Sequence, residues 1–300
     1  MISIYTLFGS IFMLFNIIYL YSKIGLTNYL YLLTLDFTKA DQKFLWITFF
    51  ISFAAKIPMF PVHIWLPEAH VEAPTIGSVL LAVLLLKLGT YGIIRFLLPL
   101  FPYGTLCYNP LINTFALISI VYTSLIAIRQ IDLKKIIAYS SIGHMNAVVL
   151  GLITLNKINL EGAIFQMLSH GIVSGAFFFC VGSFYKRYKV RSLKYLGGFM
   201  QTYPILSTIF LIFMLANISF PGTSSFVGEF VIFLGLINNS TFLVFIASLN
   251  MITGAIYTLW TYNRIAFANF KNLIIQKNFD CDRNEFYIYL ILLYFLFLLG

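Results

Sequence analysis

The sequence predicts an all-α membrane protein that crosses the bilayer about nine times. Of its 300 residues, 60% are apolar and only 10% are charged, and the mean hydropathy is +0.92. These values lie far outside the range of soluble domains. Long apolar runs recur along the whole sequence, and each is too long and too uniformly apolar for the alternating strands of a membrane barrel.

Charged and turn residues divide the sequence into nine candidate transmembrane spans. Pro58 in the second span and Pro221 with Gly222 in the seventh should each break a helix, because proline cannot continue the backbone hydrogen-bond ladder. The ninth span is short, so we expect it to tilt or to end within the far interface. The predicted spans are 1–22, 43–66, 75–98, 110–129, 135–156, 161–184, 203–237, 241–263 and 285–300.

The basic residues are distributed unevenly between the two sides of the membrane. Loops on the N-terminal side hold twelve Lys and Arg residues, Lys271 and Lys277 among them, against five on the other side. The positive-inside rule places the N-terminus in the cytoplasm or matrix, and nine spans then place the C-terminus opposite. Because these charges follow that rule, the net charge of +9 does not indicate a nucleic-acid partner.

The central positions of five spans hold titratable residues. On insertion scales, a Lys or Asp at the centre of a span costs roughly 2.5–3.5 kcal/mol of insertion free energy. The three charged members together would therefore cost on the order of 8–10 kcal/mol if uncompensated. A histidine alone is more often an ordinary core residue. The set as a whole favours proton transfer, because burial brings lysine and glutamate within reach of proton exchange near neutral pH. The five are Lys56, Lys87, His144, His170 and Glu229.

Two polar residues should support the histidines. Ser140 and Gln166 each precede a histidine by four residues and therefore share its helix face. The three cysteines lie far apart, without metal-ligand or disulfide spacing, so we expect neither a metal site nor a redox cofactor in this chain.

The spacing of the broken spans predicts an internal repeat. Discontinuous helices at corresponding positions of two halves are typical of inverted-repeat transporters, and here they lie five spans apart. The predicted division is therefore a complete repeat over 110–263, the last three helices of a first repeat over 1–98, and a terminal helix over 285–300.

Three segments closely resemble the antiporter-like membrane subunits of respiratory complex I, the NADH:ubiquinone oxidoreductase. The resemblance covers nearly the whole chain, and it implies proton-transfer roles for the five central residues. The glutamate at position 229 favours one branch of the family over those that carry a lysine there. The segments are "KIPMFPVHIWLPEAHVEAPTIGSVLLAVLLLKLGTYGIIRF" (56–96), "IRQIDLKKIIAYSSIGHMNAVVLG" (128–151) and "FPGTSSFVGEF" (220–230).

The resemblance also implies a setting for the chain. It implies a place beside other membrane-arm subunits and lipids in the mitochondrial inner membrane, with the N-terminus in the matrix and the C-terminus in the intermembrane space. NADH, FMN, iron–sulfur clusters and ubiquinone would be bound by other subunits. Family members have about five more helices before the start of this sequence, and one of these carries a glutamate that pairs with the lysine matching Lys56. A separate small polypeptide would supply those helices in a split subunit, unless the first half-channel has been lost.

Other interpretations of the sequence stay open. A cation/proton antiporter subunit would use the same fold without NADH oxidation, and a structural spacer would not pump. Asp132, Lys134 and Lys135 are expected to cap and orient the fourth and fifth spans. Four residues at or beyond the end of the second span would either admit protons from the N-terminal side or anchor the interface: His63, Glu68, His70 and Glu72.

Overall fold

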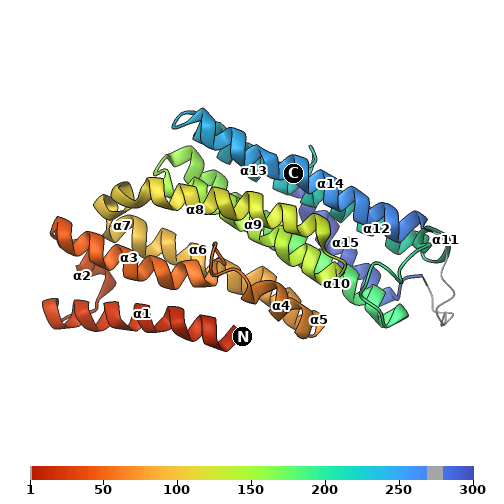
Figure 1. Ribbon diagram of the computed structural model, residues 1–300, viewed down its shortest axis with the longest axis horizontal. Coiled ribbons are helices and arrows are strands. Elements are labelled where there is room, and N and C mark those ends of the chain that lie inside the picture. The colour runs from red at the N-terminus through yellow and green to blue at the C-terminus, as the bar shows by residue number, and fades with distance from the viewer. Residues whose placement is uncertain (1, 269–279) are drawn as a thin grey trace.

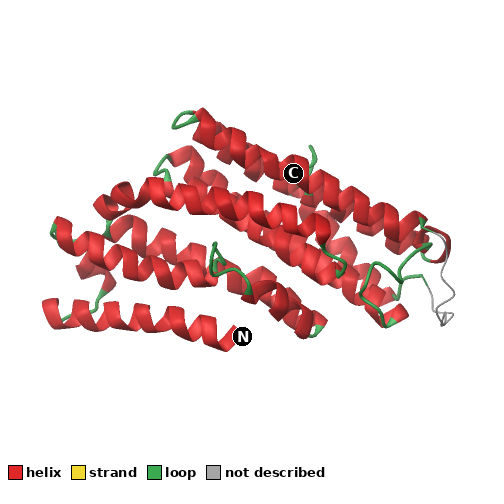
Figure 2. Ribbon diagram, viewed as in Figure 1, coloured by secondary structure: helices red, strands yellow, loops and turns green. Residues whose placement is uncertain are grey.

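The computed structural model describes residues 2–268 and 280–300, which fold into helices without a strand (Figures 1 and 2). The long helices are α1 (Ile2–Ile24), α8 (Pro102–Arg129), α9 (Leu133–Ile153), α10 (Lys157–Tyr188), α14 (Thr241–Phe267) and α15 (Arg283–Leu298). Two spans consist of helix pairs, α3 (Lys39–Lys56) with α4 (Trp65–Glu72) and α12 (Pro204–Asn217) with α13 (Ser224–Ile237). Short helices α2 (Tyr29–Leu33) and α11 (Phe199–Thr202) lie in connections.

The third span is a continuous helix of mixed type. It consists of α5 (Thr75–Leu80), the π-helical segment η1 (Leu81–Leu85), α6 (Leu86–Gly92), a second π-helical segment η2 (Ile93–Leu97), and α7 (Leu98–Leu100). Such π-helical turns are rare and occur frequently at functional sites. Here they lie on both sides of Lys87, which is on α6.

The predicted all-α membrane fold, with two discontinuous spans, is confirmed. Six helices in the described part of the chain are long and apolar enough to cross a membrane, and α12 and α13 are shorter apolar helices that form the two halves of the seventh span. The second span is longer than expected, because α4 adds a second half that ends at Glu72 rather than at residue 66. The residues from Glu68 to Glu72 therefore lie on a helix and not in a loop.

Both breaks have a local cause. α3 ends at Lys56, and the next residue still donates its N–H to the carbonyl of Phe53 (2.9 Å). Pro58 has no N–H to continue this ladder. In the seventh span, residues 218–223 separate α12 from α13, and Gly222 adopts a φ of +92°, which glycine tolerates best.

The helices form an elongated bundle, with α1 at one edge and α14 at the opposite edge (Figure 1). α9 occupies the interior, since 94% of its 18-residue apolar stretch is buried. In α1, only 11% of the corresponding stretch is buried. Helix α9 is therefore the element around which the others pack, and it carries His144.

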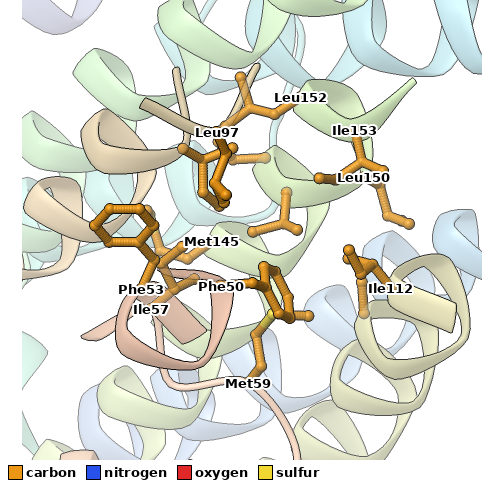
Figure 3. Close-up of a cluster of buried hydrophobic side chains, with 14 of the residues drawn as sticks. Phe50, Phe53, Ile57, Met59, Leu97, Ile112, Met145, Leu150, Leu152 and Ile153 are labelled. Carbon is orange, nitrogen blue, oxygen red and sulfur yellow. The ribbon is translucent and has the colours of Figure 1, made fainter. Parts of the chain in front are cut away.

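An apolar cluster joins the first spans to this central helix. Figure 3 shows Phe50 and Phe53 of α3 with Ile57 and Met59 of the break, beside Leu97 of η2, Ile112 of α8 and four residues of α9. Between membrane helices such side chains stabilise the packing through van der Waals contacts, because lipid tails are as apolar as the side chains themselves. The cluster fixes the end of α3, and with it Lys56, against α8 and α9.

Helix α15 is held by charged residues at the end of α10. Arg187 donates to Glu285 (2.7 Å) and Lys186 donates to Asp282 (2.6 Å). The hydrogen bond from Lys186 lowers the pKa of the Asp282 carboxyl, so this carboxylate stays ionised to a lower pH than an ordinary aspartate. Lys271 and Lys277, on which the predicted orientation partly rests, lie outside the described residues.

Candidate functional site

Lys87 is held by its own helix and by a neighbouring one. Its ammonium group donates to the carbonyl oxygen of Ala82 in η1 (2.6 Å), five residues earlier. Its Nζ atom also lies 2.8 Å from Nδ1 of His170, which is on α10. Gly171 of α10 lies beside this contact: a Cβ atom on it would be in ordinary van der Waals contact with the lysine, 3.9 Å from Nζ. The lysine is thus partnered although it lies within an apolar span.

From Lys87, a series of contacts leads through the two histidines to Glu229. The rings of His170 and His144 have centroids 5.8 Å apart, and both side chains are buried. Nδ1 of His144 lies 2.6 Å from Oε1 of Glu229, which is only 2% exposed. We call Lys87, His170, His144 and Glu229 the buried row; its four members come from the third span, α10, α9 and α13.

Both oxygens of the Glu229 carboxylate have further partners. Gln166 donates its side-chain amide to Oε1 (3.3 Å), and Ser219 donates its hydroxyl to Oε2 (2.7 Å). A buried carboxylate is expensive unless it is paired and hydrogen-bonded. These contacts meet that requirement from α10 and from the break before α13.

The structure brings together four of the five central residues and orders the histidines differently from the sequence. Because α10 lies beside the third span and α9 faces α13, His170 follows Lys87, and His144 precedes Glu229. Lys56 is separate: it is the last residue of α3 and is partly buried. A Cβ on Gly89 would lie 3.2 Å from the Lys56 Cβ, so this lysine lies beside α6. Within the described residues its ammonium has no hydrogen-bond or ion-pair partner.

The two predicted supporting residues have different environments. Gln166 was expected only to share a helix face with His170. It also contacts Glu229, at the end of the buried row and on another helix. Ser140 donates its hydroxyl to the carbonyl of Ile137 (2.8 Å) and is hydrogen-bonded to Tyr257 of α14, which also contacts Asn217. Ser140 thus links α9 with α14 one helical turn before His144.

Two residues around α4 have roles that the sequence did not reveal. Lys134, which is 3% exposed, donates to the carbonyl of Ala73 (2.6 Å) and to Ser78 (3.3 Å), so it caps the end of α4. His70 is fully buried and stacks on Phe178 with ring centroids 4.4 Å apart. The interfacial anchoring considered for His70 is therefore wrong, because α4 carries it into the bundle.

Ser219 was also missed. It is the residue that follows the end cap of α12, and its hydroxyl reaches Glu229 across the break. The available signal was a serine two residues before the predicted Pro221–Gly222 break. Among the described residues, no group of His, Cys, Asp and Glu side chains is placed to hold a metal ion.

Two broken spans, a titratable residue beside each break and a buried row between them define an antiporter-like membrane subunit. The family model described as "NADH:quinone oxidoreductase/Mrp antiporter, TM" matches residues 1–253. The chain belongs to this family.

Its curated relatives include subunits of respiratory complexes. It is 56% identical to "NADH-ubiquinone oxidoreductase chain 4" of Marchantia polymorpha and 53% identical to that of Arabidopsis thaliana, each over 96% of this chain. It is 42% identical to "NADH-quinone oxidoreductase subunit M" of Rhodobacter capsulatus over 99% of this chain. The branch that Glu229 favoured, that of subunit 4, is therefore confirmed. The chain spans 58% of the length of the first two relatives and 60% of the third.

Solved structures show the same fold. A chain of "Respiratory complex I from Thermus thermophilus with bound NADH" matches with a TM-score of 0.91 at 28% identity, over 100% of this chain and 64% of that one. A chain of "Structure of Mrp complex from Dietzia sp. DQ12-45-1b" matches with a TM-score of 0.83 at 21% identity, over 90% of this chain and 50% of that one. The second match shows the fold alone.

The contact between His144 and Glu229 predicts a non-additive response to mutation. His144→Leu removes one partner of a buried pair and should destabilise the protein by about 3–5 kcal/mol. Glu229→Leu should also destabilise it, whereas the double variant should recover much of the combined loss, because no unpaired group remains. Thermal unfolding of the purified membrane protein measures this. A double variant that loses the full sum of the single effects would show that the two residues are energetically independent.

Proposed function

We propose that the chain is a proton-translocating membrane-arm subunit of NADH:ubiquinone oxidoreductase. The observation that carries the proposal is the buried row, in which Lys87, His170, His144 and Glu229 contact one another in succession. Four titratable groups from four spans have no structural need to meet inside a membrane protein. The names of the relatives support the assignment to a respiratory complex.

Each histidine can relay a proton because imidazole accepts on one nitrogen and releases from the other. In both rings Nδ1 faces an end of the row, Lys87 for His170 and Glu229 for His144. Nε2 of His144 is buried and has no hydrogen-bond partner among the described residues. This atom is available for transfer to or from His170, whose ring centroid lies 5.8 Å from the ring centroid of His144.

The driving signal would be electrostatic. Moving one proton against a membrane potential requires about 2.3 kcal/mol per 100 mV. Two unit charges 4 Å apart interact by about 4 kcal/mol at the effective dielectric constant typical of proteins. A change of charge at Lys87 is therefore large enough to move a proton at its neighbour. Redox chemistry would stay outside this chain, with NADH, FMN, iron–sulfur clusters and ubiquinone bound by other subunits.

Lys56 would belong to the first half-channel. Its ammonium needs a carboxylate that the described residues do not provide, and we assign that carboxylate to a partner segment, which carries the remaining helices of the family. The support is its lack of a partner and the length of the relatives, of which this chain spans 58%. In this arrangement residues 110–263 form the second repeat, and 1–98 complete the first with the partner. Residues 285–300 form a terminal helix.

The proposed location is the mitochondrial inner membrane. The excess of basic loop residues on the N-terminal side supports an N-terminus in the matrix and a C-terminus in the intermembrane space. Plant relatives named as ubiquinone oxidoreductase subunits support the same membrane. Other membrane-arm subunits and lipids would surround the chain.

The alternative function is that of a cation/proton antiporter subunit. The family description includes the Mrp antiporter, and the Mrp chain from Dietzia shares the fold. Transport that depends on Na⁺ and proceeds without NADH oxidation would favour this alternative. A structural spacer is disfavoured because it has no reason to keep Lys56, Lys87 and Glu229 in apolar spans.

Lys87→Ala should abolish or sharply reduce proton pumping while assembly survives. Alanine deletes the ammonium that begins the buried row but suits the helix. The exposed Lys157, on α10, provides the control: its ion pair with Glu161 spans 3.9 Å on the surface and is worth little. Lys157→Ala should leave pumping unchanged. Proton release per NADH oxidised, measured in reconstituted vesicles, distinguishes the two. Full pumping by the Lys87 variant would exclude the mechanism.

The intact complex should contain a second small apolar chain with a glutamate in the middle of a span. Mass spectrometry of the complex, isolated in mild detergent, would detect it together with the NADH-oxidising subunits. A mass for this polypeptide well above 34.2 kDa would show instead that the missing helices belong to it. Redox subunits without such a chain would indicate loss of the first half-channel, and absence of the redox subunits would favour the antiporter.

A further inference from the structure

The end of α12 has an unusual residue at a demanding backbone position. Ser219 adopts a left-handed conformation with a φ of +63°. Its N–H bonds the carbonyl of Ala216 (3.1 Å), and the N–H of Phe220 bonds that of Leu215 (3.1 Å). This is the hydrogen-bond pattern of a Schellman motif, in which the left-handed residue is usually glycine. The backbone alone therefore does not explain a serine here.

The side chain of Ser219 supplies a reason. It is 2% exposed, and its hydroxyl donates to Oε2 of Glu229 at 2.7 Å. The two residues lie ten positions apart, Ser219 within the break and Glu229 on α13. A hydrogen bond to an ionised acceptor is shorter and stronger than a neutral one, and the low dielectric of the interior strengthens it further. The hydroxyl thus fixes one oxygen of the carboxylate.

The other oxygen of Glu229 is the one that meets the buried row. Oε1 lies 2.6 Å from Nδ1 of His144. Because a carboxylate is planar, holding Oε2 also sets the direction in which Oε1 points. The left-handed backbone of Ser219 places its hydroxyl at the one site from which it can do this. The strain of that backbone is of the kind that collects at functional sites.

We propose that Ser219 is a positioning residue, which holds the Glu229 carboxylate so that Oε1 stays on His144. This inference rests on the proposed function and deepens it. Ser219 would not carry the proton itself. It would keep the last transfer of the buried row at hydrogen-bond distance, and the break in the seventh span would serve to bring its hydroxyl there.

Two substitutions separate positioning from a purely structural role. Ser219→Gly and Ser219→Ala both delete the hydroxyl, but glycine relieves the left-handed backbone and alanine does not. A structural role predicts that the glycine variant equals the natural protein or exceeds it in stability and activity. A positioning role predicts that both variants lose proton transfer alike. Lys189→Gly is a matched control, since exposed Lys189 is also left-handed, with a φ of +56°, at the end of α10.

The experiment uses the intact complex that contains this chain, reconstituted in vesicles. The rate of proton pumping driven by NADH oxidation is measured together with the infrared difference spectrum between oxidised and reduced complex. The carboxyl band that disappears in Glu229→Gln belongs to Glu229. Both Ser219 variants should slow pumping roughly 10–100-fold, the effect of a small misplacement of a reacting group. Both should also shift that band, and Lys189→Gly should change neither.

The outcomes separate this inference from the proposed function. Loss of pumping in Glu229→Gln with normal pumping and an unshifted band in Ser219→Gly would overturn the positioning role alone. Impairment of the alanine variant but not the glycine variant would also overturn it, because backbone strain would then be the cause. Normal pumping in Glu229→Gln would overturn the proposed function and the inference together.

Discussion

The structure depends on one constraint: a charged group inside an apolar span must find its partners on other elements. Glu229 shows how strongly this acts, because its carboxylate is met by His144 from α9, Gln166 from α10 and Ser219 from the break. Gly228 makes the approach of α13 to α10 possible, since a Cβ there would lie 2.9 Å from the Cα of Gln166. The spacing of these helices is set by the contacts that one carboxylate requires.

The same contacts give the bundle its function under the proposed mechanism. A group that is partnered by titratable neighbours responds to their charge, whereas one partnered only by backbone does not. Lys87 has one partner of each kind, the carbonyl of Ala82 in its own helix and the imidazole of His170. The π-helical segment η1 and the break of the seventh span each supply a polar group to the row, the carbonyl of Ala82 and the hydroxyl of Ser219. Irregular backbone and buried charge therefore occur together, although either one alone would destabilise a membrane span.

Much of this organisation could be predicted from the sequence. Apolar runs and prolines located the apolar helices of the described residues and both breaks, because helix hydropathy and the missing proline N–H are local properties. The central residues were found because charge in an apolar run is conspicuous.

Which of the central residues contact one another could not be predicted: the packing of α10 beside the third span places His170 before His144. Ser219 was missed because a serine near a turn has no local signal for a hydroxyl aimed at a residue ten positions away. The second half of the second span was predicted too short because Glu68 and His70 resemble interfacial residues in the sequence, whereas both lie on α4 and the fold buries His70.

The central claim is that the buried row carries protons as a connected unit, and His170 tests it most directly because it lies between Lys87 and His144. The measurement is the number of protons pumped per NADH oxidised by the complex with His170→Gln. Glutamine can hydrogen-bond to the lysine and suits the helix, but it cannot accept and release a proton near neutral pH. The account predicts that the number falls while the complex remains assembled and NADH is still oxidised. An unchanged number would contradict it, because protons would then cross without passing through the row.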